Sequence, residues 1–113
     1  MSSPQALAST LMTVTPVEYA RFVAHWLADA NDLHQNPALT GNPVVDAVVA
    51  AAAAHVAFTA GNPVPAWTEQ PDRFLDALWY PGPDALFPNA LVHSPLCFTV
   101  HGVLIEEDSL RSV

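Results

Sequence analysis

The sequence predicts an all-α fold, a compact bundle of two longer helices at about residues 16–30 and 43–60 and three or four short C-terminal helices. Apolar residues recur at three- and four-residue spacing over the first segment, which is typical of an amphipathic helix. Helix-start signals that contain proline recur along the chain. The chain is 51% hydrophobic and 12% charged, so it can build one hydrophobic core.

The first long helix is expected to begin after Thr15, because Thr15-Pro16-Val17-Glu18 has the pattern of a capping box with proline in the first turn. Its apolar face would comprise Tyr19, Phe22, Val23, Trp26, Leu27 and Ala30. Residues 1–14 show little periodicity. We therefore expect a flexible N-terminal arm over 1–14 and a single helical domain over 15–113.

The second long helix is expected to begin with Asn42 as its cap and Pro43 in its first turn, and to end at Gly61. Almost all of its side chains are apolar, and residues 50–54 are all alanine. A helix that is apolar on every side is covered by other elements in a soluble chain. The sequence therefore predicts that this helix is the central one.

Short helices are expected in the C-terminal half. The spacing predicts an amphipathic helix over 71–80 and another over 84–93. Ser94, followed by proline, has the pattern of a helix cap, and Gly102 would end the short helix that follows. A last helical turn is expected at 108–110.

The charge balance bears on partners and on location. Eleven acidic residues face three arginines and no lysine, which gives a formal net charge of -8. A basic patch that binds phosphate is therefore disfavoured, and we expect no direct nucleic-acid partner. The chain lacks a signal-peptide pattern and a membrane-spanning apolar run, so we expect a cytoplasmic protein that does not bind membranes. Cys97, the single cysteine, excludes an intrachain disulfide and is expected as a buried thiol.

Candidate catalytic groups do not form a pattern that supports a reaction. The five histidines lack metal-ligand spacing, and His55 is expected as a core or interface histidine with a hydrogen-bond partner. Ser94, His101 and Asp108 could be read as a triad, but no nucleophile-elbow glycines accompany them, and capping explains Ser94 better. We therefore predict no enzyme activity, no catalytic, metal-binding or cofactor-binding residues, and no cofactor.

A contact surface is the better expectation. A lightly charged small protein exposes apolar surface, which a second copy or a partner often covers, so we expect a homodimer or a protein complex. Trp67 and Tyr80 lie beside prolines and are expected to be half exposed, and an acidic run follows near the C-terminal end. The candidate partner-binding residues are Trp67, Tyr80, Glu106, Glu107 and Asp108.

A family resemblance covers about residues 65–110. It is carried by Pro65, Trp67, Pro71, Arg73, Phe74, Leu75, Trp79-Tyr80, Ala90-Leu91-Val92, Ser94-Pro95, Phe98, Gly102-Val103 and Leu110. This order resembles the C-terminal region of small actinobacterial antitoxin-like proteins associated with nucleotidyltransferase-like toxins. The resemblance implies a protein that neutralises or regulates a partner by contact. The arginines that follow the position of Phe98 in that pattern are here replaced by Thr99, Val100 and His101, and no N-terminal helix-turn-helix is found.

The leading hypothesis is therefore a non-enzymatic protein-interaction module, antitoxin-like in its action. One alternative is a small-ligand-binding helical domain in which Trp26, His55 and Trp79 line a pocket. The other is an acidic inhibitor that mimics nucleic acid, which requires carboxylates spaced along one face.

Overall fold

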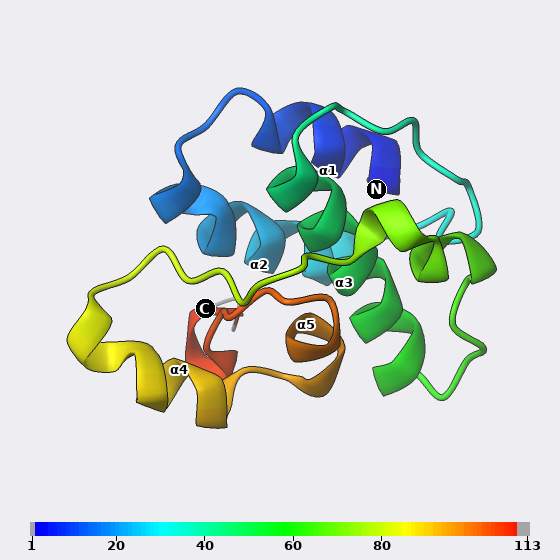
Figure 1. The fold of residues 1–113 in the computed structure, drawn as a ribbon. Coiled ribbons are helices and arrows are strands. Elements are labelled where there is room, and N and C mark those ends of the chain that lie inside the picture. The colour runs from blue at the N-terminus through cyan, green and yellow to red at the C-terminus, as the bar shows by residue number, and fades with distance from the viewer. Residues whose placement is uncertain (1, 111–113) are drawn as a thin grey trace.

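Helix α3 runs through the middle of the molecule, and the other elements lie around it (Figure 1). The structure is a computed structural model that describes residues 2–110. Its α-helices are α1 (Pro4–Leu11), α2 (Tyr19–Asp29), α3 (Pro43–Thr59), α4 (Phe87–His93) and α5 (Leu96–Val100). Short 3₁₀ turns lie at Pro16–Glu18, Ala66–Glu69, Pro71–Arg73, Asp84–Leu86 and Glu107–Leu110. Residues 2–110 contain no β-strand, which confirms the all-α prediction.

The central position of α3 follows from its side chains. Residues 47–53 are fully buried, and α1 and α5 both contact this helix. Small alanine side chains let neighbouring helices approach closely. Asn42 caps the helix as expected, since its Oδ1 accepts from the amides of Val44 and Val45 at 3.0 and 3.3 Å.

The expectation of a flexible arm over 1–14 is wrong for residues 4–11, which form α1. The Ser3 hydroxyl oxygen accepts from the amide of Ala6 at 3.2 Å and caps the helix. Leu7 and Leu11 are buried in the core. The indole Nε1 of Trp26 on α2 donates to the Ser3 carbonyl at 3.0 Å and ties the start of α1 to α2. Two buried leucines are too few to reveal a helical periodicity in the sequence. They are enough to pack a short helix against the core.

The first long helix is confirmed over Tyr19–Asp29, with a 3₁₀ turn before it. The capping box forms only in part. The Thr15 hydroxyl contacts Glu18 Oε1 at 3.1 Å instead of a backbone amide, so no side chain caps this helix start.

The predicted helix over 71–80 is wrong. After one 3₁₀ turn the chain is irregular, with bends at residues 74, 76 and 77, and it pairs with the segment that follows α5. The amides of Leu75 and Trp79 donate to the carbonyls of His101 and Gly102 at 3.1 and 2.8 Å. A short helix between prolines is marginal by itself, and this distant segment satisfies the backbone groups instead.

The interpretation of Ser94 as a cap is also wrong. Its hydroxyl donates to the Ala90 carbonyl at 2.6 Å, in the last turn of α4, and α5 begins without a side-chain cap. The helical prediction over 84–93 is confirmed by a 3₁₀ turn followed by α4. Gly102 ends α5 with a φ of 85°, as expected, and a 3₁₀ turn occupies the last predicted position.

Candidate functional site

An open groove of about 450 Å³ lies where three distant parts of the chain meet. These parts are the turn before α2 with the start of that helix, the segment from residue 80 to 86, and the segment from 104 to 109. The lining residues are Val17, Ala20, Tyr80, Pro81, Gly82, Pro83, Leu86, Leu104, Ile105, Glu106 and Ser109. We call this surface the C-terminal groove.

The walls of the C-terminal groove are mostly apolar. Val17 is 72% exposed at its edge, and Leu86 is 49% exposed. The fold leaves much of both side chains in water, so contact with another molecule would bury further apolar surface.

Tyr80 is held in place by its neighbours. Its ring lies edge-on to that of Phe87, with centroids 6.2 Å apart and an interplanar angle of 74°. A Cβ atom at position 82 would collide with the Tyr80 hydroxyl, so only glycine at that position admits this placement of the ring. Tyr80 is half-buried, as expected, and presents a preformed aromatic surface.

The acidic end of the chain lies beside this surface. Glu106 lines the groove, and Glu107 is exposed in the turn that follows. The side chain of Asp108 lies outside the described part of the structure. Arg21 is the exposed cation among residues 2–110, and it forms a salt bridge with Glu18 at 3.2 Å. The structure therefore brings Tyr80 and Glu106 together at a groove whose charged lining residue is acidic.

Trp67 does not belong to this surface, and the expectation that it is half exposed is wrong. The residue is 6% exposed, and its indole Nε1 donates to the Leu33 carbonyl at 2.7 Å. The guanidinium carbon of Arg73 lies 5.0 Å from the centroid of its ring. This tryptophan between prolines therefore fixes the loop before α3.

Val17 and Leu86 are groove residues that the sequence analysis did not identify. A signal for Val17 exists, because it falls on the side of the predicted helix opposite the apolar face that contains Tyr19 and Val23. An apolar residue on the polar side of an amphipathic helix marks exposed apolar surface. Leu86 offers no comparable pattern, since its exposure depends on how the loop packs.

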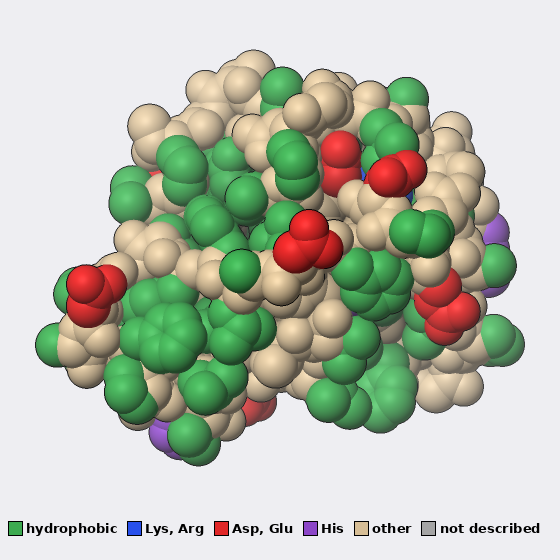
Figure 2. Space-filling model, in the orientation of Figure 1, with side chains coloured by type: hydrophobic (Ala, Val, Ile, Leu, Met, Phe, Trp, Pro, Cys, Tyr) green, Lys and Arg blue, Asp and Glu red, His purple; other side chains and the backbone are tan. Residues whose placement is uncertain are grey.

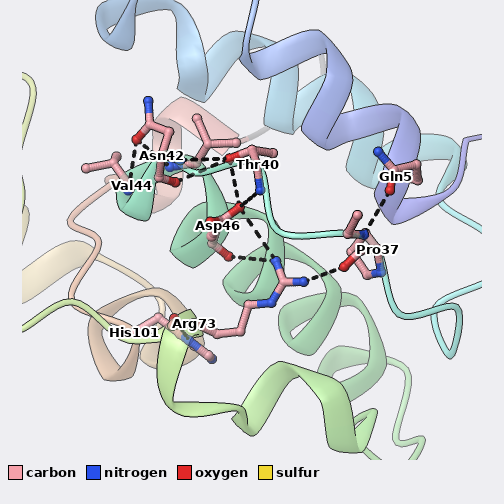
Figure 3. Close-up of polar contacts among 10 residues, drawn as sticks. Gln5, Pro37, Thr40, Asn42, Val44, Asp46, Arg73 and His101 are labelled. Atoms are coloured by element: carbon pink, nitrogen blue, oxygen red, sulfur yellow. Dashed lines mark hydrogen bonds and ion pairs between the residues drawn. The ribbon is translucent and has the colours of Figure 1, made fainter.

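A second unexpected feature is the buried guanidinium of Arg73 (Figure 3). Arg73 is 1% exposed; its Nη2 donates to the Pro37 carbonyl at 2.7 Å, and its Nη1 to the Asp46 carbonyl at 3.4 Å. Nη1 also lies 4.0 Å from Asp46 Oδ1, which accepts from the amide and hydroxyl of Thr40 at 2.9 and 2.8 Å. Burial lowers the pKa of Arg73, and the nearby carboxylates of Asp46 and Asp72 partly offset this. These contacts join α3, the loop before it and the turn after it, which is a structural role.

Comparison with known proteins gives no relative. No family model, no curated protein and no solved structure matches the chain. Within residues 2–110, no helix is long and apolar enough to cross a membrane. The described side chains also include no group of three or more histidine, cysteine or acidic residues that could hold a metal ion.

Trp26, His55 and Trp79, which the small-ligand alternative places in one pocket, each have a different partner in the structure. Trp26 is buried against the start of α1, as described above. The His55 ring lies 5.6 Å from that of Phe98, and the Trp79 ring lies 5.8 Å from that of Tyr19. Burial lowers the pKa of His55, and the charge of Glu107 opposes this shift.

Cys97 is partly buried on α5. Burial raises the pKa of its thiol, so the neutral form is favoured at neutral pH. The thiol therefore has little nucleophilic character.

Proposed function

We propose that this chain is a non-enzymatic protein-interaction module, and that its C-terminal groove binds an apolar segment of a basic protein. The observation that supports this most directly is the meeting of Tyr80, Glu106 and the exposed Val17 at one open surface. An antitoxin-like inhibitor works in this way, and the resemblance over residues 65–110 favours such a role.

The groove suits a peptide anchor by size and shape. Its volume of about 450 Å³ falls in the range of roughly 300–1,000 Å³ that is usual for ligand sites. Prolines at 81 and 83 stiffen one wall, and Tyr80 is already fixed against Phe87. A preformed apolar surface loses little conformational entropy on binding.

Charge favours a basic partner over a second copy. The chain carries a net charge of -8, and Glu106 lines the groove. Two copies would bring like charges together, whereas lysine or arginine beside an apolar anchor would be attracted. On the face in Figure 2, apolar side chains gather near α4, and the carboxylates stand apart from one another. Mimicry of nucleic acid requires a continuous acidic stripe, and this face does not carry one.

Selection of short random peptides on the immobilised chain tests this proposal. We expect the selected peptides to combine an apolar anchor with lysine or arginine. Val17→Asp places a charge at the apolar edge and should weaken their binding at least about tenfold. Glu106→Gln should weaken binding less and reduce its dependence on salt.

Two matched controls locate the site. Val92→Asp changes a residue that is 75% exposed on α4 but does not line the groove, and Asp32→Asn removes one charge from a distant loop. Both should leave peptide affinity unchanged. An equal loss of peptide affinity in Val17→Asp and Val92→Asp would contradict binding at the C-terminal groove. Selected peptides without basic residues would contradict the proposed basic partner. A dimer at micromolar concentration that Val17→Asp dissociates would identify a second copy as the occupant instead.

A further inference from the structure

A second pocket, which shares no lining residue with the C-terminal groove, lies between α3, α5 and the turn at Ala66–Glu69. Its volume is about 440 Å³. The lining residues are Ala54, Val64, Thr68, Glu69, Phe74, Leu96, Cys97, Val100 and His101. We call it the His101 pocket.

The walls of the His101 pocket are apolar, and its mouth is open. Ala54 forms part of the inner wall on α3 and is buried. Leu96 and Val100 lie on α5 and are more than half exposed, at 66% and 57%. An apolar molecule that enters would cover both side chains as well as the inner wall.

Two buried polar side chains, Thr68 and His101, line this apolar space. His101 is 4% exposed, and its Nδ1 lies 2.7 Å from the Arg73 carbonyl oxygen. A carbonyl oxygen only accepts, so Nδ1 carries the proton and donates. The ring also stacks on Phe74, with centroids 4.3 Å apart and planes 11° apart. These two contacts fix both the tautomer and the orientation of the imidazole.

The second ring nitrogen of His101 is left as a hydrogen-bond acceptor. Within residues 2–110 no donor contacts Nε2. Nε2 also remains accessible to water. Among the described residues, the side-chain nitrogen or oxygen that is both fully enclosed and without a hydrogen-bond partner is Nε of Arg73. Burial lowers the pKa of His101; the hydrogen bond to the Arg73 carbonyl and the charge of Glu69 oppose this, and the charge of Arg73 adds to it. The neutral ring therefore predominates at neutral pH.

The other polar groups in the pocket restrict what can bind. The Thr68 hydroxyl donates to the Pro65 carbonyl at 2.7 Å, so its proton is already used. Glu69 is exposed at the pocket, and the whole chain is acidic, so an anionic ligand would be repelled.

We propose that the His101 pocket binds a small, neutral, largely apolar molecule with one hydroxyl or N–H donor, of the phenol class, which donates to Nε2 of His101. The apolar walls supply most of the affinity. Nε2 of His101 selects molecules with a donor, because an apolar ligand would leave this nitrogen desolvated and unpaired.

The pair p-cresol and toluene tests this, since the two molecules share a ring and a methyl group and differ by one hydroxyl. In amide NMR titrations, p-cresol at millimolar concentration should shift the signals of α5 and of residues near Ala54. Toluene should bind about tenfold more weakly, the value of one neutral hydrogen bond.

Two variants locate the ligand at the pocket mouth. Val100→Trp should block entry and abolish the shifts. Val92→Trp introduces the same side chain at an exposed site outside the pocket and should leave p-cresol binding unchanged. Equal binding by both variants would overturn the proposal, as would the absence of shifts in the unaltered chain.

His101→Asn tests the acceptor. The amide nitrogen of asparagine is as many bonds from the backbone as Nδ1, so it can still donate to the Arg73 carbonyl. Nε2 is lost, and the asparagine Oδ1 takes the place of Cδ2, one bond nearer the backbone than Nε2. The affinity for p-cresol should fall to that for toluene, and toluene affinity should not change. If the preference for p-cresol persists, it does not depend on Nε2, which contradicts the proposed acceptor. Val100→Trp still tests the pocket if the asparagine variant does not fold.

Discussion

Arg73 is the residue on which the packing between α3 and the loops around it depends. Its guanidinium reaches from a 3₁₀ turn to the Pro37 carbonyl and to Asp46, and it covers the ring of Trp67. A buried arginine is costly to desolvate, and these contacts offset that cost only while all of them are present. Removing Arg73 leaves the buried Asp46 carboxylate with its hydrogen bonds from Thr40 but without a neighbouring cation.

We expect Arg73→Met to lower the free energy of unfolding by roughly 3–5 kcal/mol, because it leaves the buried Asp46 carboxylate without its cation. Arg21→Met is the control, since Arg21 forms an exposed ion pair with Glu18 and should cost less than about 1 kcal/mol. Urea unfolding measures both values. Similar losses in the two variants would mean that Arg73 does not hold these segments together.

At the scale of the helices, two starts have the same sequence pattern and different structures. Asn42 accepts from two backbone amides, whereas the Thr15 hydroxyl contacts a carboxylate. We therefore expect Asn42→Ala to cost about 1 kcal/mol and Thr15→Ala to cost less than about 0.5 kcal/mol. Thermal unfolding followed by circular dichroism measures the difference. If both substitutions cost the same, the cap of α3 contributes no more than an exposed side-chain contact.

The ends of α3 and α5 permit a similar comparison, because each is followed by a glycine with positive φ. Gly102 has a φ of 85°, and a Cβ there would lie 2.9 Å from the Leu75 Cβ. Gly61 has a φ of 74° and nothing within 4 Å. Gly102→Ala should cost roughly 2–4 kcal/mol, for backbone strain and overpacking, and Gly61→Ala about 1 kcal/mol for strain alone. Urea unfolding should show this order. The reverse order would contradict the close contact between Gly102 and Leu75.

The long helices could be predicted because their signals are local. Periodicity over the first helix and the cap of α3 involve residues within a few positions of one another. The segment 71–80 could not be predicted, since its backbone pairs with residues after α5, and the two segments are far apart in sequence. The burial of Trp67 cannot be predicted for the same reason, because its partner Leu33 lies in a distant loop.

The candidate site was predictable in part. Tyr80 and Glu106 were identified from residue type and position, and the structure places both at the C-terminal groove. The apolar edge at Val17 comes from the opposite end of the chain, so its proximity to Tyr80 is a property of the tertiary fold. The acceptor role of His101 likewise depends on the Arg73 carbonyl and on Phe74, which the expected helix over 71–80 would have placed differently.

For the molecule as a whole, two partly or fully buried histidines couple folding to pH. Burial lowers the pKa of both His55 and His101 below the ordinary value of 6.5. The unfolded chain therefore takes up protons at a higher pH than the folded chain. The stability that these two neutral histidines contribute is fully present above the pKa of the unfolded state. It is lost as pH falls through 6.5 toward the pKa of the folded state.

The contribution of His101 to this loss can be isolated. Glu69 and Arg73 are the charged groups that act on its ring, and neither removes the effect of burial. Asparagine at this position cannot take up a proton, so His101→Asn should lose less stability than the unaltered chain between about pH 7.5 and about pH 5.5. His34→Asn, at an exposed histidine, should behave like the unaltered chain. Urea unfolding at the two pH values gives the loss of stability for each protein. Carboxylate titration is common to all three proteins and cancels when these losses are compared. An equal loss in all three would show that His101 titrates alike in the folded and unfolded states.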